Sequence, residues 1–226
     1  MPEPGYVIDI VGEGKVDRGR GDDQPEPPTT GVVPILVHRL CDQPATMRVR
    51  RRPPLFLQGK GLWQKVRFAK RQASYSGSAG LVYVLDTEGN HPGQLDQLRR
   101  GRDFELREYP AAVGVAHPCI EAWLLADASA ISRAMRLDRH PQTPAQPELL
   151  PAPCKNRDQN PKTMLGRCAG LYRHLSAPET TQTVQEIRDL DAIRTRCPAS
   201  FAPFADEVLA IIKPIFEKNG IDPAVS

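Results

Sequence analysis

Long hydrophobic runs are missing from this sequence. No apolar stretch approaches the roughly 20 residues of a membrane-spanning helix, so we expect no membrane partner. The first residues, Met1 to Gly5, also lack the basic and apolar regions of a secretory signal peptide. We therefore expect a cytoplasmic protein.

Cysteine is scarce, and its spacing follows no known pattern. The chain has five cysteines, an odd number, and none of them forms a CxxC pair. The five histidines form no HxH or HExxH motif either. This spacing argues against a disulfide framework and against a zinc site. We expect reduced and partly buried thiols, with Cys119 in the core rather than acting as a nucleophile.

Acidic residues are absent between Arg48 and Arg71, although the whole chain has a net charge of only +3. Phe56, Trp63 and Phe68 stand among the cations of this segment. Cations interleaved with aromatic rings are typical of nucleic-acid-binding surfaces. The alternative is that the rings anchor the core and the arginines form a solvated strand end. The predicted nucleic-acid contacts are Arg48, Arg50, Arg51, Arg52, Lys60, Lys65, Arg67, Lys70 and Arg71.

Short strand-like and helix-like segments alternate along the chain. Four segments are predicted to be strands, at 6–11, 47–52, 80–85 and 111–116. Segments with helical spacing are found at 32–40, 61–72, 92–100, 120–126, 163–175, 183–193 and 201–216. This alternation predicts an α/β fold with a mostly parallel sheet flanked by helices and a C-terminal helical layer.

Proline marks the expected division of the chain. The 23 prolines cluster at 25–28 and at 141–161, which predicts loops at both places. The second cluster suggests an α/β domain over 1–150 and a helical elaboration over 151–226 that packs on the same domain.

Acidic side chains stand where predicted strands end. Glu13 follows the first strand, Asp86 and Glu88 follow the third, and Glu121 comes shortly after the last. The carboxyl ends of parallel strands share one edge of a sheet, so these side chains could converge there. Clustered carboxylates repel one another, and a hard divalent cation such as Mg²⁺ or Mn²⁺ relieves the repulsion. Taken singly, each acid has an ordinary alternative: Glu13 as a helix N-terminal acid or a solvated loop residue, Asp86 as a turn or cap residue, and Glu121 as the partner of an arginine.

Four stretches resemble a known family. These are IVGEG at 10–14, VYVLDTE at 82–88, VAHPCIEAWLLAD at 115–127 and CPASFAPF at 197–204. They are similar to the Toprim-like DUF4276 family, a relative of the RloB and OLD-type nucleases. The resemblance implies a Toprim-like fold and metal-dependent phosphodiester hydrolysis. It assigns metal ligation to Glu13, Asp86 and Glu88 and adds Glu121 as a further catalytic acid, with Glu88 one methylene longer than the family's aspartate.

A Mg²⁺- or Mn²⁺-dependent nuclease is therefore our leading hypothesis. Lys15 or Lys162 would offset negative charge in the transition state. The resemblance also implies an ATPase partner in a prokaryotic anti-phage defence system, and the chain has no Walker A motif of its own. Self-association into a homo-oligomer stays open. The alternatives are a non-catalytic nucleic-acid-binding or adaptor subunit and, third, a phosphatase or receiver-like phosphoacceptor centred on Asp86.

Overall fold

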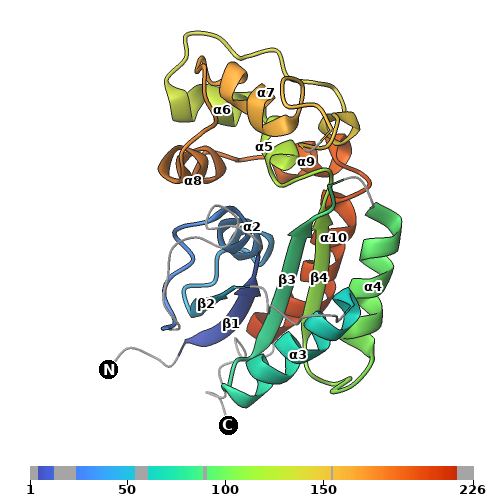
Figure 1. Ribbon diagram of the computed structural model, residues 1–226. Coiled ribbons are helices and arrows are strands. Elements are labelled where there is room, and N and C mark those ends of the chain that lie inside the picture. Colours follow the sequence, from blue (N-terminus) through green and yellow to red (C-terminus); the bar gives the residue numbers. More distant parts are fainter. Residues whose placement is uncertain (1–4, 13–23, 54–60, 89–90, 154, 218–226) are drawn as a thin grey trace.

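Four parallel strands form the centre of the molecule. The computed structural model describes residues 5–12, 24–53, 61–88, 91–153 and 155–217. The strands pair in the order β2-β1-β3-β4, and every pairing is parallel (Figure 1). Their bounds are β1 Tyr6–Val11, β2 Met47–Arg52, β3 Gly80–Asp86 and β4 Ala111–Ala116. The predicted α/β fold with a parallel sheet and C-terminal helices is confirmed.

Strand β3 shows why the sheet needs cover on both faces. Its side chains alternate between two hydrophobic clusters, because successive residues of a strand point to opposite faces. Leu81 and Tyr83 belong to one cluster, and Val82 and Val84 belong to the other. A parallel strand with two apolar faces must have a layer of helices on each side.

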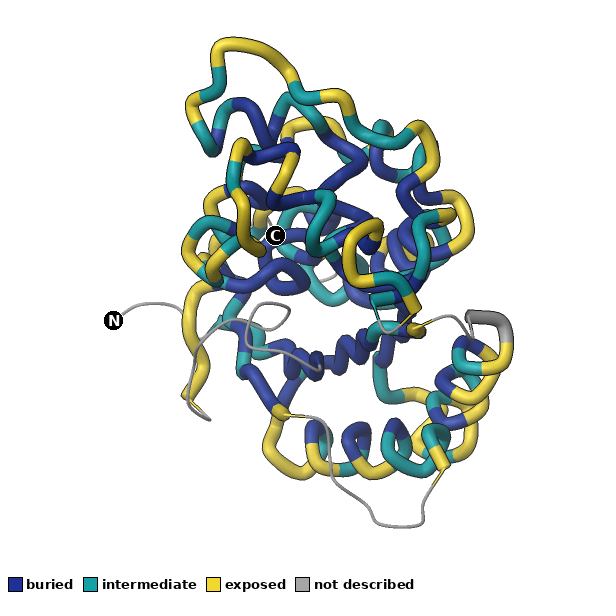
Figure 2. The backbone as a smooth tube through the Cα atoms, turned by 45° about the horizontal axis from the view of Figure 1, so that its top comes forward, coloured by how far each residue is buried: buried dark blue, intermediate teal, exposed yellow. Residues whose placement is uncertain are grey.

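Helices α3 (Leu62–Tyr75) and α4 (His91–Asp103) cover one face. The buried residues of α3 include Val66, Ala69 and Ala73, which recur at helical spacing and pack on the odd-numbered residues of β3. In Figure 2 the tube alternates between buried and exposed turns along such surface helices, whereas the strands are buried over most of their length.

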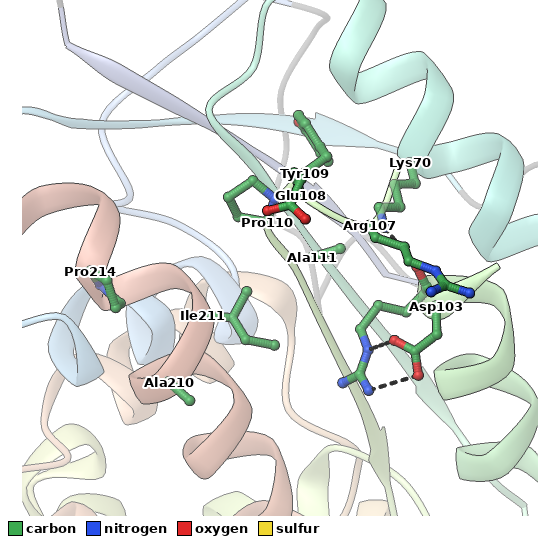
Figure 3. Close-up of a pocket in the computed structure, with 11 residues that line it drawn as sticks. Lys70, Asp103, Arg107, Glu108, Tyr109, Pro110, Ala111, Ala210, Ile211 and Pro214 are labelled. Atoms are coloured by element: carbon green, nitrogen blue, oxygen red, sulfur yellow. Dashed lines mark hydrogen bonds and ion pairs between the residues drawn. The ribbon is translucent and has the colours of Figure 1, made fainter. Parts of the chain in front are cut away.

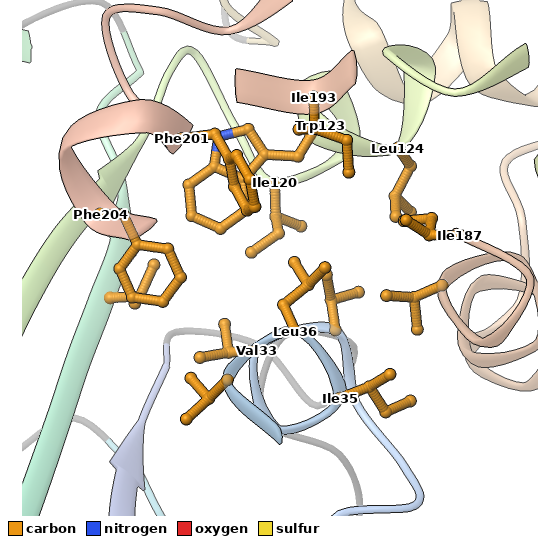
Figure 4. Packing of buried hydrophobic residues seen from close by; sticks show 14 of the residues in the cluster. Val33, Ile35, Leu36, Ile120, Trp123, Leu124, Ile187, Ile193, Phe201 and Phe204 are labelled. Atoms are coloured by element: carbon orange, nitrogen blue, oxygen red, sulfur yellow. The ribbon is translucent and has the colours of Figure 1, made fainter. Parts of the chain in front are cut away.

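The opposite face is covered by α2 (Val32–Leu40) and by the C-terminal helices α10 (Phe201–Glu207), η2 (Val208–Ile212, a π-helix) and α11 (Lys213–Glu217). Trp123 lies at the centre of this cluster (Figure 4). Its ring stacks on Phe204 with the centroids 5.3 Å apart and meets Phe201 edge-on at 5.2 Å. The indole N–H donates to Ser200 Oγ at 2.8 Å, so burial leaves no unpaired donor on this ring.

A group of short helices lies beyond the carboxyl ends of the strands (Figure 1). They are α5 Glu121–Leu125, α6 Ala128–Met135, η1 Pro147–Leu149, α7 Pro161–Cys168, α8 Ala177–Gln185 and α9 Leu190–Arg196. Their apolar residues join the cluster that contains Trp123, and this one cluster runs from Ile8 to Ile212 along the chain. The N-terminal and C-terminal parts therefore share a continuous core.

Two predicted helices have the wrong limits. The helix predicted over 163–175 ends at Cys168, because Gly170 adopts a left-handed conformation with φ of 74° and reverses the chain. The helix predicted over 183–193 is two helices, α8 and α9. The side chain of Asp189 accepts hydrogen bonds from the backbone N–H groups of Asp191 and Ala192 and thereby starts α9.

Both edges of the sheet are covered. Glu207 accepts a hydrogen bond from the backbone N–H of Val113 at 3.0 Å on the outer side of β4. Glu26 pairs with Val49 in an isolated antiparallel bridge on the outer side of β2. Covered edges prevent pairing with strands of another chain. Within the described ranges, no helix has the length and apolar character needed to cross a membrane.

Candidate functional site

Asp86 and Glu121 come together at the carboxyl edge of the sheet. Asp86 is the last residue of β3, and Glu121 is the first residue of α5, which follows the neighbouring parallel strand β4. One carboxylate oxygen of each, together with Cys119 Sγ, forms a cluster whose atoms lie within 4.8 Å of one another. The predicted convergence of acids is thus present for Asp86 and Glu121.

The connection from β4 to α5 is tied to the end of β3. The backbone N–H of Ile120 donates to Asp86 Oδ1 at 2.9 Å. The backbone N–H of Glu88 donates to the carbonyl of Pro118 at 3.1 Å. Thr87 Oγ1 lies 2.6 Å from His117 Nδ1, which gives His117 a structural contact. These bonds fix the segment that carries Cys119 and Glu121 beside Asp86.

Lys162 brings a positive charge beside Glu121. Its Nζ lies 4.0 Å from Glu121 Oε1, and its side chain is 38% exposed while that of Glu121 is 14% exposed. Lys162 stands in the first turn of α7, after Asn160, whose side chain caps the helix by accepting a hydrogen bond from Thr163 N–H. This cap places the lysine, which the sequence predicts as a charge-offsetting residue, next to the acid pair.

Cys119 is buried beside the two carboxylates. Burial raises its pKa far above the ordinary value of a thiol, and the negative charges of Glu121 and Asp86 raise it further. The three side chains of the cluster, two carboxylates and a thiol, could hold a metal ion. Carboxylate oxygens are the ligands that Mg²⁺ and Mn²⁺ prefer, whereas sulfur is the preferred ligand of thiophilic metals.

Among the remaining predicted site residues that the structure describes, Glu88 does not join this cluster. Glu88 is exposed, its φ of 47° turns the chain in the left-handed sense, and it is not one of the three clustered residues. Glu13 and Lys15 lie outside the described residues. Strand β1 pairs with β3 up to Val11, so the chain leaves β1 on the same side of the sheet as Asp86.

Three arginines of β2, Arg50, Arg51 and Arg52, do not form an exposed basic face, and the prediction that they do is wrong. Arg50 and Arg52 both pair with Asp9, a fully buried residue of β1. Arg51 is also buried and pairs with Glu26 at 2.7 Å. Buried charges need such partners, since an unpaired charge inside a protein is very costly.

The prediction that Lys70 belongs to an exposed basic face is also wrong. It is buried and donates to the carbonyls of Arg102 at 2.6 Å and Glu105 at 3.0 Å, at the end of α4. Arg67 and Arg71 share the carboxylate of Glu105. An acid distant in sequence therefore offsets two further cations of this segment.

Three predicted nucleic-acid contacts remain, Arg48, Lys60 and Lys65. Arg48 donates to the carbonyls of Ala45 and Met47. Lys65 lies on α3 and is partly exposed. Lys60 is outside the described residues. The prediction that these residues contact nucleic acid stays a prediction.

A cavity of about 660 Å³ lies at the opposite edge of the sheet, beside the start of β4 (Figure 3). Ala210 and Ile211 form its apolar side, while Lys70 and the paired Arg102 and Asp103 form its polar side. Lys70, Arg102 and Asp103 already contact neighbouring protein groups. This cavity is separate from the acid pair at the carboxyl edge.

Comparisons with known proteins add no relative. No protein family, no curated protein and no solved structure matches this chain. The case for a function therefore depends on the acid pair at the carboxyl edge and on the resemblance of its flanking segments.

Proposed function

We propose that the chain is a metal-dependent nuclease of Toprim type that hydrolyses phosphodiester bonds at the site of Asp86 and Glu121. The observation that carries the proposal is the approach of these two carboxylates, within 4.8 Å at the carboxyl edge of a parallel sheet, from segments that resemble the Toprim-like family. An open parallel sheet binds its ligands at this edge. The ATPase partner and the defence setting belong to the same proposal and rest on the resemblance alone.

Asp86 and Glu121 would hold the cation. A bound Mg²⁺ or Mn²⁺ would act as a Lewis acid on a phosphodiester and would activate water for attack. The Ile120 N–H holds one oxygen of Asp86, which limits the rotation of this carboxylate. Lys162, at 4.0 Å from Glu121, is placed to offset the negative charge of an incoming phosphate.

The same contacts also favour the adaptor alternative. Asp86 accepts a structural hydrogen bond, and Glu121 has an ammonium neighbour, so both acids help to stabilise the sheet end. In an adaptor subunit they would have no further role. Metal binding separates the two functions.

The test is calorimetric titration of the protein with Mg²⁺ and with Mn²⁺, followed by cleavage assays on single- and double-stranded DNA and RNA. Asp86→Asn keeps the oxygen that accepts from Ile120 but removes the charge, so the fold should survive. We expect this variant and Glu121→Gln to lose at least about 100-fold in cleavage, because even groups that only orient metal ligands contribute about 10- to 100-fold.

Asp206→Asn is the matched control. Asp206 is 64% exposed and pairs with Arg194, on a part of the surface formed by α9 and α10. It should cleave as the wild type does. A wild type that binds neither cation would contradict the proposal and support the adaptor, and equal cleavage by Asp86→Asn would place the active site elsewhere.

A further inference from the structure

Helix α7 also forms one wall of a second pocket. This pocket has a volume of about 430 Å³. We call it the α7 pocket, and it is lined by Asp158, Thr163, Arg167, Leu171, Tyr172, Arg173 and His174. Thr163 directly follows Lys162 in the chain, so the pocket begins one residue from the lysine beside Glu121.

Backbone hydrogen bonds and close packing hold the turn that follows α7. The N–H of Gly170 donates to the carbonyl of Arg167 at 3.0 Å, and that of Leu171 donates to Gly166 at 2.9 Å, which is the Schellman pattern of a helix end. The returning chain passes so near that a Cβ on Gly166 would lie 2.1 Å from the Arg173 carbonyl oxygen. The segment that carries Tyr172 is therefore fixed against the helix.

Two side chains of the α7 pocket are fixed as well. Arg173 makes a two-pronged ion pair with Glu179, with both N–O distances 2.7 Å. His174 Nε2 lies 3.3 Å from Thr163 Oγ1. These contacts hold a cation and an imidazole at neighbouring positions after the turn.

Tyr172 contributes nothing to the fold in its present position. Its side chain is fully exposed, at 108% of the reference value, although it stands on this well-ordered turn. An exposed ring on a rigid support, next to Arg167 and His174, has the composition of a base-stacking platform with phosphate contacts. Arg167 lies five residues beyond Lys162, about 7.5 Å of helical rise.

We propose that the α7 pocket binds a single-stranded segment of nucleic acid, with a base stacked on Tyr172 and neighbouring phosphates on Arg167 and His174. The proposal rests on the proposed nuclease function, because α7 then directs the strand toward Lys162 and the acid pair. Stacking on a side chain requires an unpaired base, since the bases of a duplex already stack on each other. The pocket therefore selects single-stranded substrates over duplexes.

The experiment measures the binding of fluorescein-labelled oligo(dT) and oligo(U) by anisotropy, with EDTA present so that no cleavage occurs. Tyr172→Ala should weaken binding about 5- to 150-fold, the range for loss of one stacked base. Tyr172→Phe should bind like the wild type, because it keeps the ring. Arg167→Ala should lower the slope of log affinity against log salt by about 0.7, the value for one phosphate contact on a single strand.

Tyr75→Ala is the matched control, since Tyr75 is another largely exposed tyrosine, at 87%, at the end of α3. It should bind like the wild type. Thermal unfolding of Tyr172→Ala should match that of the wild type, so a folding defect cannot explain its loss of binding. Unchanged binding by Tyr172→Ala, or tighter binding of a duplex of the same length than of the single strand, would overturn the proposal.

The outcome is independent of catalysis. If the wild type binds no divalent cation but Tyr172→Ala loses affinity, the α7 pocket is confirmed and the nuclease proposal fails. If Asp86→Asn abolishes cleavage but Tyr172→Ala binds normally, the nuclease proposal is supported and the α7 pocket is rejected.

Discussion

Removal of the Asp9 carboxylate tests whether the arginines of β2 belong to the interior. Asp9 is fully buried in the middle of β1. Its carboxylate accepts hydrogen bonds from Arg52 Nε and from Ser78 Oγ, and it lies 3.5 Å from Arg50 Nη1. Both arginine side chains are nearly buried, with exposed fractions of 13% for Arg50 and 10% for Arg52.

Asp9→Ala would remove the buried carboxylate that Arg50 and Arg52 share. Breaking a buried ion pair by removing one partner costs about 3–5 kcal/mol of the free energy of unfolding. For a chain of this size each kcal/mol lowers the melting temperature by about 2–4 °C. We therefore expect Asp9→Ala to unfold roughly 6–20 °C below the wild type, multiplying the two ranges.

Urea unfolding and thermal unfolding, both followed by circular dichroism, measure this loss. Asp206→Ala is the control, because it breaks an ion pair whose acid is 64% exposed and should cost under about 1 kcal/mol. In Asp9→Ala/Arg52→Met the second substitution should recover part of the stability, since it removes one of the two buried charges that faced Asp9. If Asp9→Ala loses no more than Asp206→Ala, the arginines are solvated and the basic-face hypothesis returns.

Three further predictions follow from local geometry. Gly114→Ala should lower the free energy of unfolding in urea by about 1–3 kcal/mol, because the new Cβ would lie 2.6 Å from the Phe204 ring. An unchanged midpoint of urea unfolding would contradict this packing. The Glu179 carboxyl should titrate by NMR with a pKa of about 2, lowered chiefly by the hydrogen bond from Arg173, and Arg173→Ala should raise it toward 4.5. Because folding lowers this pKa, the stabilisation is complete above 4.5 and is lost as the pH falls through about 2. In a Cys154→Ser background, iodoacetamide should label the native protein far more slowly than the protein in urea. The reason is that burial raises the pKa of the four remaining thiols, which are Cys41, Cys119, Cys168 and Cys197.

The strands were predictable because their signals are local. The run from Gly80 to Leu85 is apolar throughout, and the structure buries it on both faces. Asp86 directly follows this run and Glu121 follows the next predicted strand, so parallel pairing alone was enough to bring them together. Glu88 was different, because its position depends on a left-handed turn that no pattern of hydrophobicity encodes.

The charges of β2 were not predictable from their own segment. Arg50 and Arg52 meet an acid more than 40 residues away, at separations of 41 and 43. Arg51 meets Glu26 across 25 residues. A count of charges within the segment finds no acid, whereas parallel pairing of β1 with β2 sets Asp9 directly opposite Arg50. The topology, rather than the local composition, neutralises this segment.

The α7 pocket escaped prediction for a related reason. Tyr172, Arg173 and His174 read as the end of a helix until Gly170 is recognised as its stop. That stop returns the chain across Gly166 and opens the pocket beside the helix.

Helix α7 connects the two proposed sites, because it carries both Lys162, beside Glu121, and residues that line the α7 pocket. Asp86 and Glu121 carry like charges within 4.8 Å of each other, and like charges at that separation repel. The helix brings the Lys162 ammonium to 4.0 Å from Glu121, where it offsets part of this repulsion. The helix begins after its cap at Asn160, with Lys162 beside Glu121 and with Thr163 and Arg167 in the lining of the α7 pocket. A single strand of nucleic acid that occupies the pocket and reaches Asp86 and Glu121 would bring its phosphates to a site that is already negatively charged. A cation at this site would offset both the carboxylates and the phosphates.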